Sequence, residues 1–183
     1  MTRPRSCLVR RATLADVAEV ARLSVLAGAE AQRDLPALHP AQELSAPDLA
    51  LRLLEDLDDG NGLYVAELEG RVVGFAQVTG LMVGDGGHLL ELRQLYVAPE
   101  HRLRGAGRLL LRLVLRDLAQ RPGPPALRAW AATGSGAATF LEAAGGAATR
   151  QRWKVGSDGI AVRGLAFSWT ASPLPALRGH ALA

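Results

Sequence analysis

Apolar side chains recur along the chain with two periods, one typical of helices and one of strands. The clearest helical period follows Gly107, where leucines and a valine share one side while Arg108, Arg112 and Arg116 recur every four residues on the other. Shorter β-prone runs, bounded by Gly, Pro and Asp, predict strands. The expected helices cover residues 13–29, 45–57, 108–118 and 135–144, and the expected strands cover residues 7–11, 63–68, 72–78, 89–97, 127–131, 149–155 and 160–169.

The order of these elements defines the fold class. Two strands separated by Glu69-Gly70 form a hairpin, and the strand–helix–strand unit around Gly107 requires a crossover between parallel strands. The sequence therefore predicts an α/β protein whose central mixed sheet of about seven strands is flanked by about four helices.

Residues 89–116 carry the strongest functional signal. Pro99 ends an apolar strand, a short basic loop follows, and Gly105 and Gly107 precede the arginine-bearing helix. The first N–H groups of a helix have no partner inside it, and the positive end of the helix dipole favours anions. The turn therefore suits a ligand that carries phosphate.

Two common phosphate-binding motifs do not fit this turn. A Walker loop requires Gly-Lys-Ser/Thr, but Arg108 follows Gly107, and Lys154 is the only lysine of the chain. A dinucleotide fingerprint requires a small residue where Leu110 stands and an acidic residue near position 125, where Pro124 and Pro125 stand. A turn needed only for tight packing remains the structural alternative.

The remaining pattern is Arg102-x-x-Gly105-x-Gly107, with Leu95-Tyr96-Val97-x-Pro99 upstream. It resembles the pyrophosphate-binding motif of the GNAT superfamily of N-acetyltransferases, and the element order resembles the GNAT fold over roughly residues 7–170. The resemblance implies one N-acetyltransferase domain across residues 1–183, and the two prolines of the segment 171–183 predict an irregular tail. It also implies two parallel strands that splay apart to admit acetyl-coenzyme A (acetyl-CoA) as co-substrate.

The resemblance also assigns residues to the cofactor. The pyrophosphate is expected on the amides of the loop, with charge-assisted bonds from Arg102, Arg104 or Arg108. The strand edge is expected to pair with the pantetheine arm, and the N–H of Val97 to point at the thioester carbonyl. The implied cofactor-binding residues are Leu95, Tyr96, Val97, Arg102, Leu103, Arg104, Gly105, Ala106, Gly107 and Arg108.

The resemblance assigns catalysis less completely. Glu91 occupies a position where some members carry a catalytic glutamate, although it could instead pair with Arg93. Many members have a tyrosine acid where Leu141 stands and an asparagine where Gly134 stands. The expected activity is transfer of an acetyl group to a primary amine, on a small molecule or a peptide, by direct attack. The alternative is a non-catalytic module that binds acyl-CoA.

The composition of the chain limits the kinds of partner that we expect. The chain has 183 residues, 49% hydrophobic, with a net charge of +3 and aromatics at 4%, none interleaved with a basic run, so nucleic acid is not an expected partner. No apolar run approaches the ~20 residues of a membrane span, and no signal-peptide core follows the start, which predicts a cytoplasmic protein.

Cysteine and histidine usage predicts no metal site. Cys7 is the only cysteine, so no internal disulfide is expected, and the four histidines are scattered. The resemblance makes His39 and Glu43 candidate acceptor contacts, because they lie between the first two expected helices, where members of the family bind their acceptors. The three tryptophans are expected on strands as core residues. The resemblance leaves the oligomeric state open, with a homodimer through the last hairpin as one option.

Overall fold

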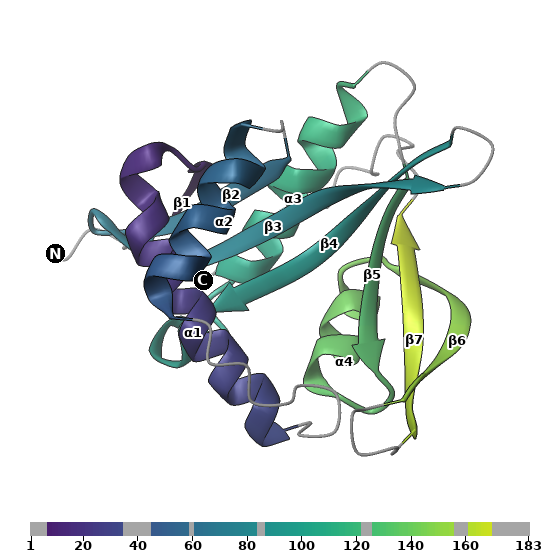
Figure 1. Ribbon diagram of the computed structural model, residues 1–183. Helices are drawn as coiled ribbons and strands as arrows, with labels where there is room; N and C mark the ends of the chain where they lie inside the picture. The colour runs from purple at the N-terminus through teal and green to yellow at the C-terminus, as the bar shows by residue number, and fades with distance from the viewer. Residues whose placement is uncertain are drawn as a thin grey trace, which may run out of the picture.

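The computed structural model describes residues 7–34, 45–58, 61–83, 87–121, 126–155 and 161–169. These residues form one seven-stranded sheet with helices on both faces (Figure 1). In chain order the elements are β1 (Leu8–Arg11), the 3-10 turn η1 (Leu14–Asp16), α1 (Val17–Asp34), α2 (Ala46–Asp58), β2 (Gly62–Leu68), β3 (Arg71–Val83), β4 (Gly87–Val97), the 3-10 turn η2 (Pro99–His101), α3 (Ala106–Ala119), β5 (Ala126–Ala132), α4 (Gly136–Ala143), β6 (Ala147–Val155) and β7 (Ala161–Trp169).

The predicted order of helices and strands is confirmed, and the largest differences in length are at the ends of α1 and β3, while several other elements begin or end within about two residues of the prediction. α1 continues past Ala29 to Asp34, because no glycine or proline interrupts residues 30–34. β3 continues past Val78 to Val83, because it pairs with β4 along its whole second half. The predicted tail at 171–183, the turn at 156–159, and His39 and Glu43 lie outside the described residues.

The strands are ordered β1-β2-β3-β4-β5-β7-β6, and β4–β5 is the one parallel pair of this sheet. That pairing is short: it joins Leu89, Leu90 and Glu91 to Ala126, Leu127 and Arg128. Beyond Glu91 the two strands diverge, as Figure 1 shows. The expected gap between two parallel strands is therefore present in the sheet.

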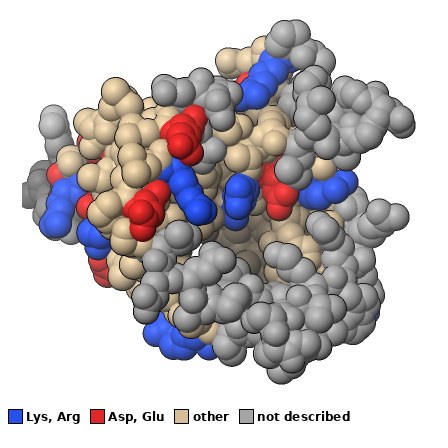
Figure 2. All heavy atoms as spheres, in the orientation of Figure 1, with Lys and Arg blue, Asp and Glu red and all other residues tan. Residues whose placement is uncertain are grey.

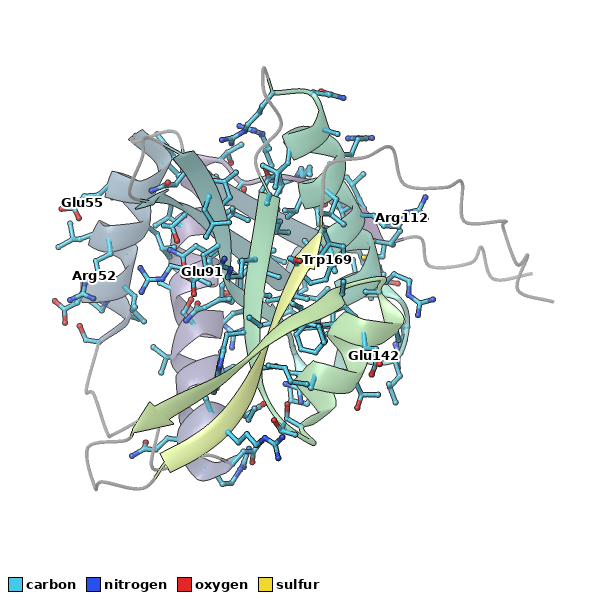
Figure 3. The ribbon with its side chains drawn as sticks, turned by 90° about the vertical axis from the view of Figure 1, so that its right-hand side faces the viewer. Arg52, Glu55, Glu91, Arg112, Glu142 and Trp169 are labelled. Atoms are coloured by element: carbon cyan, nitrogen blue, oxygen red, sulfur yellow. The ribbon has the colours of Figure 1, made fainter. Side chains whose placement is uncertain are left out.

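A β-bulge determines which face of the sheet each side chain of β4 points to. Gln94 pairs with Gln77 and Leu92 with Val78, so Arg93 is the extra residue. Leu90 and Leu92 pack into the core under α3 and α4, whereas Tyr96, on the far side of the bulge, packs into the core under α1 and α2. Because side chains alternate along a strand, Glu91 lies on the face of α1 and α2. Figure 3 shows it there, with Trp169 on the opposite side of the sheet.

Candidate functional site

The loop between η2 and α3 presents a run of free backbone donors. Among the residues that the structure describes, no acceptor is found for the N–H groups from Leu103 to Arg108. The next N–H along the chain, that of Leu109, donates to the Gly105 carbonyl at 3.0 Å. Positive φ angles at Leu103 (61°) and Gly105 (85°) turn the chain so that these amides follow one another around the helix start. Such a run of N–H groups forms a concavity that binds anions.

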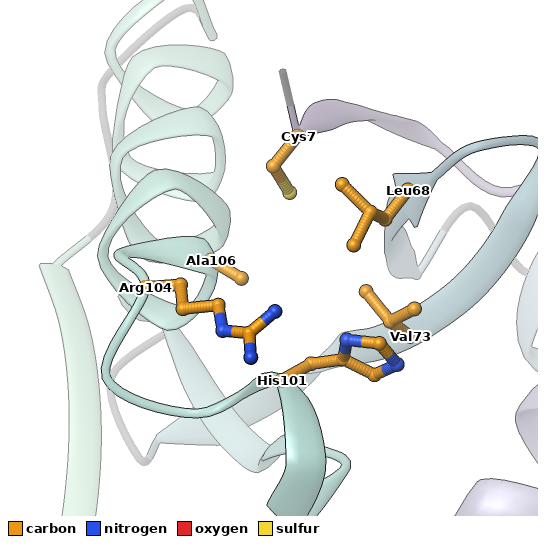
Figure 4. Close-up of a pocket in the computed structure, with 6 residues that line it drawn as sticks. All are labelled: Cys7, Leu68, Val73, His101, Arg104 and Ala106. Atoms are coloured by element: carbon orange, nitrogen blue, oxygen red, sulfur yellow. The ribbon is translucent and has the colours of Figure 1, made fainter. Parts of the chain in front are cut away.

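The three arginines of this loop differ in where their side chains go. Arg102 donates from Nε to the Val97 carbonyl at 2.8 Å and from Nη2 to Glu30 Oε2 at 2.6 Å. Arg104 lines a pocket with Cys7 and His101 (Figure 4). Arg108 is exposed. The guanidinium of Arg102 is thus committed to the protein, and the amides carry most of the anion-binding capacity.

The edge of β4 that faces the gap is defined by one hydrogen bond. The Ala98 N–H donates to the Val73 carbonyl at 2.9 Å, next to the Val97–Gly74 pair. In an antiparallel ladder this bond makes Val97 a pair whose N–H and C=O point away from β3. Leu95, two residues earlier, has the same orientation. Leu95 and Val97 therefore direct their backbone groups to the side from which β5 has departed.

Tyr96 faces differently from its two neighbours. Its backbone belongs to the ladder with β3, and its side chain packs in the core under α1 and α2. The Tyr96 hydroxyl donates to Glu30 Oε1 at 2.9 Å, and the Arg102 guanidinium lies 5.2 Å from the centre of the Tyr96 ring. Burial, reinforced by the bond to Glu30, raises the pKa of Tyr96 to about 12.

Glu30 is a residue of this site that the sequence pattern did not identify. Burial raises the pKa of its carboxyl, but the hydrogen bonds from Arg102 and Tyr96 outweigh burial, and the net pKa is lowered. Glu30 is therefore a carboxylate that ties α1 to the end of β4 and to the first residue of the glycine loop. Its partners are 66 and 72 residues away in the chain, which is why no local motif includes it.

Glu91 lies where β4 and β5 part. Its register neighbours are Thr79 on β3 and Arg128 on β5. The side chain is partly buried, and among the described residues it makes no hydrogen bond or ion pair, with Arg93 or any other group. The carboxylate is thus available to a bound molecule.

The positions expected for a general acid hold no acidic group. Leu141 is buried in the core under α3 and α4, and Gly134 adopts a φ of 77° in the turn before α4. The chain has two tyrosines. Tyr64 is fully buried in the core beneath α3, and Tyr96 is bound to Glu30 on the other face. A tyrosine acid therefore does not reach the gap from α4.

A separate small pocket lies on the β1–β3 side of α3, away from the gap. Cys7, Leu68, Val73, His101, Arg104 and Ala106 line it (Figure 4). Burial raises the pKa of the Cys7 thiol, which favours the unreactive protonated form. Cys7 is therefore not placed to form a covalent intermediate at the gap.

The tryptophans divide between the two faces. Trp169 is buried and its Nε1 donates to the Ala144 carbonyl at 3.3 Å, which agrees with a core role. Trp130 is only partly buried on β5, where its ring lies against Gly164. The side chain of Trp153 is outside the described set.

Comparison with known proteins identifies the class. Residues 29–145 match the model of the acetyltransferase (GNAT) family, and the chain belongs to that family. A search of the curated proteins finds no match.

Three solved structures illustrate the likeness in fold. The yncA protein of Salmonella typhimurium, solved with its cofactor acetyl-CoA, has a TM-score of 0.75 and 22% identity over 91% of this chain and 94% of that one. A ribosomal-protein-alanine N-acetyltransferase of Brucella melitensis has a TM-score of 0.73 and 26% identity over 88% and 98%. A phosphinothricin acetyltransferase of Sinorhizobium meliloti, in complex with acetyl-CoA, has a TM-score of 0.72 and 20% identity over 89% and 87%.

The described residues lack two further features. They contain no group of three or more His, Cys, Asp or Glu side chains arranged to hold a metal ion. Their helices include none with the length and apolar character needed to cross a membrane.

Proposed function

We propose that the protein is an N-acetyltransferase that moves the acetyl group of acetyl-CoA to a primary amine by direct attack in a ternary complex. The observation that carries the proposal is the position of six consecutive free amides, Leu103 to Arg108, at the helix start beside the gap between β4 and β5. Structures of similar fold were solved with acetyl-CoA, which supports the choice of co-substrate.

Each part of the co-substrate has a matching part of the chain. The amides of the loop suit the pyrophosphate, and Arg104 and Arg108 supply positive charge nearby. The N–H and C=O groups of Leu95 and the N–H of Val97 suit the amide-bearing pantetheine arm, which would add to the sheet as a short strand, whereas the Val97 carbonyl is occupied by Arg102. The side chain of Arg102 acts indirectly, because it holds the loop to Glu30.

Glu91 is the proposed general base. An amine with a reference pKa near ~10.4 is almost wholly protonated at neutral pH, so it must lose a proton before it attacks. The unpaired Glu91 carboxylate, on the face that α1 and α2 cover, can receive this proton directly or through water.

We place the oxyanion donor at Leu95 rather than at Val97. At a rise of ~3.3 Å per residue, Val97 lies roughly 17–20 Å along β4 from Glu91, whereas Leu95 lies roughly 10–13 Å away. The amine must be within reach of the base, directly or through one or two waters, when it attacks the carbonyl. The N–H of Leu95 meets that condition better, and one such donor is typically worth ~2.7–4 kcal/mol of the barrier.

The leaving group needs no tyrosine in this scheme. The thiol of coenzyme A, with a pKa near the ~8.5 of an ordinary thiol, can depart as a thiolate. Leu141 and Gly134 are the observations that favour the alternative, a module that binds acyl-CoA without turnover. The unpaired Glu91 beside the gap favours the enzyme.

Two measurements separate these functions. Acetyl-CoA at about a hundred times its dissociation constant should add roughly 2.7 kcal/mol of stability and raise the unfolding midpoint by roughly 5–10 °C, whereas NADH and ATP should not. Release of free thiol should then require both acetyl-CoA and an amine. Stabilisation without turnover of any amine would favour the binding module, and no stabilisation would overturn both.

A further inference from the structure

Three polar side chains form a row across the sheet where β4 and β5 part. Thr79 on β3 is the register partner of Glu91 on β4, and Glu91 is the register partner of Arg128 on β5. The flanking residues Val78 and Leu127 pack into the core under α3 and α4. The row therefore lies on the opposite face, which α1 and α2 cover in part, and is not beneath the glycine loop.

Two members of the row, the partly buried Glu91 and the exposed Arg128, are available to a ligand. The third member, the Thr79 hydroxyl oxygen, is buried and finds no hydrogen-bond partner within the described part of the chain. Among the described residues, Glu91 and Arg128 have no ion pair or hydrogen bond either, although they are neighbours on adjacent strands. Buried polar groups are nearly always hydrogen-bonded, so the three side chains of the row together leave polar groups of this face without partners among the described residues.

The charges of this face are mixed. Figure 2 views the molecule from the side of α1 and α2 and shows acidic and basic side chains interspersed around a hollow. A uniformly acidic surface would favour a polyamine, and a uniformly basic one would favour a polyanion. The row instead places one carboxylate and one guanidinium on neighbouring strands, whose backbones lie ~4.8 Å apart.

We propose that the acceptor is a small zwitterion, a free amino acid or a close analogue, whose acidic group is bound by Arg128 while its amine faces Glu91. The proposal rests on the proposed acetyl transfer and names its substrate class. The amine and the carboxylate of an α-amino acid are separated by one carbon atom, so both reach groups on adjacent strands. Arginine binds carboxylate through two parallel hydrogen bonds, and Arg128 is the exposed member of the row.

Other amine acceptors fit the row less well. A peptide N-terminus has an uncharged carbonyl where the zwitterion has its carboxylate, and a lysine side chain has only methylenes there. A polyamine would bring a second positive charge toward Arg128. These acceptors would leave the guanidinium without a partner.

The test compares matched amines. Thiol release is measured with free amino acids and their decarboxylated counterparts, phenylalanine with phenethylamine and lysine with cadaverine. We expect kcat/KM to favour the amino acid by about tenfold or more in at least one pair. In Arg128→Gln that preference should fall close to one, with an unchanged dissociation constant for acetyl-CoA, and Arg128→Lys should retain part of it. The matched control is Arg112→Gln, an exposed arginine of α3 on the other side of the sheet, which should keep the full preference (Figure 3).

Three results would overturn the proposal. The first is turnover of peptides or polyamines without turnover of free amino acids. The second is an equal loss of rate on both members of a pair in Arg128→Gln, which would mean that Arg128 acts only on Glu91. The third is retention of the full preference in Arg128→Gln. Binding of acetyl-CoA without turnover of any amine would instead overturn the enzymatic function itself.

Discussion

Arg102 and Glu30 are joined by a 2.6 Å hydrogen bond across 72 residues of sequence. Arg102 is the first residue of the glycine motif and Glu30 lies on α1, so the bond ties the predicted phosphate loop to a helix that covers the face of the sheet with Glu91. The same guanidinium holds the Val97 carbonyl at the edge of the gap. One side chain thus connects the loop, the strand edge and the opposite face of the sheet.

Glu30→Gln should weaken acetyl-CoA binding without unfolding the protein. A neutral amide cannot hold both Arg102 and the Tyr96 hydroxyl as the carboxylate does, so the loop loses part of its preorganisation. We expect the dissociation constant to rise roughly threefold to tenfold, about 1 kcal/mol, measured by titration calorimetry. Glu19→Gln is the control, because it removes a 2.7 Å ion pair with Arg22 from the same helix. An equal rise of the dissociation constant in both variants, or no rise in Glu30→Gln, would show that Glu30 does not preorganise the loop.

Glu91→Gln should separate chemistry from cofactor binding. Loss of a general base typically lowers the rate by ~10²–10⁴-fold, whereas the glycine loop that binds the co-substrate is unaltered. We therefore expect kcat to fall and the dissociation constant for acetyl-CoA to stay constant. Glu142→Gln, on α4 at the other side of the sheet, should leave both unchanged (Figure 3). A wild-type kcat in Glu91→Gln would remove Glu91 from the mechanism.

Local patterns in the sequence predicted those parts of the fold that depend on neighbouring residues. Glu69 and Gly70 adopt the positive φ angles, 53° and 78°, that their hairpin requires. Ser135 caps α4 by accepting from the Ala138 N–H at 3.1 Å. The free amides of the glycine loop were also predictable, because a turn into a helix leaves them unpaired whatever the rest of the chain does.

Features that depend on register and on distant partners could not be predicted in this way. The bulge at Arg93 shifts the face of every later β4 residue, and no local pattern marks it. The row of Thr79, Glu91 and Arg128 exists only because three strands align, and the direction of the Arg102 side chain depends on Glu30. The chemistry of the sheet face under α1 and α2 therefore depends on these long-range contacts more than on the glycine motif.

Leu103 offers a test of strain in the loop. Its φ is 61°, a conformation that disfavours leucine by roughly 1–2 kcal/mol, and its side chain is fully exposed. Leu103→Gly should remove this strain, and the gain is offset by ~0.4–1 kcal/mol of extra freedom in the unfolded chain. We expect a net stabilisation of up to about 1.5 kcal/mol in denaturant unfolding, with acetyl-CoA binding retained. Leu103→Val should destabilise, because β-branched residues tolerate this conformation less well.

Leu14→Gly is the matched control for Leu103→Gly. Leu14 is also an exposed leucine, but its backbone is in the 3-10 turn η1 and has no positive φ. Glycine there adds freedom to the unfolded chain without relieving strain, so Leu14→Gly should destabilise by ~0.5–1 kcal/mol. A loss of stability in both variants would show that the conformation of Leu103 is not strained.

Asp16 should make stability depend on pH below 4. Its carboxylate accepts from the N–H and hydroxyl of Thr13 at 2.8 and 2.9 Å and from two nitrogens of Arg10 at 2.7 and 2.9 Å. The bonds from Arg10, which outweigh burial, lower the pKa of Asp16 to about 2. Because the pKa is lower in the folded state, the stabilisation is complete above the unfolded value of 3.8 and is lost as pH falls through about 2.

Asp16→Asn should therefore lower the free energy of unfolding by about 2 kcal/mol at pH 7. The difference from wild type should shrink as pH falls from 4 toward 2, because the wild-type carboxylate then takes up its proton and loses the same bonds. Urea unfolding across this range measures both effects. Asp34→Asn is the control, because the Asp34 side chain is 72% exposed and its one ion pair among the described residues is with Arg33 at 3.6 Å. The free energy of unfolding of Asp34→Asn should stay within about 0.5 kcal/mol of the wild-type value. A constant difference for Asp16→Asn from pH 7 to pH 2 would show that the carboxylate acts by shape and not by charge.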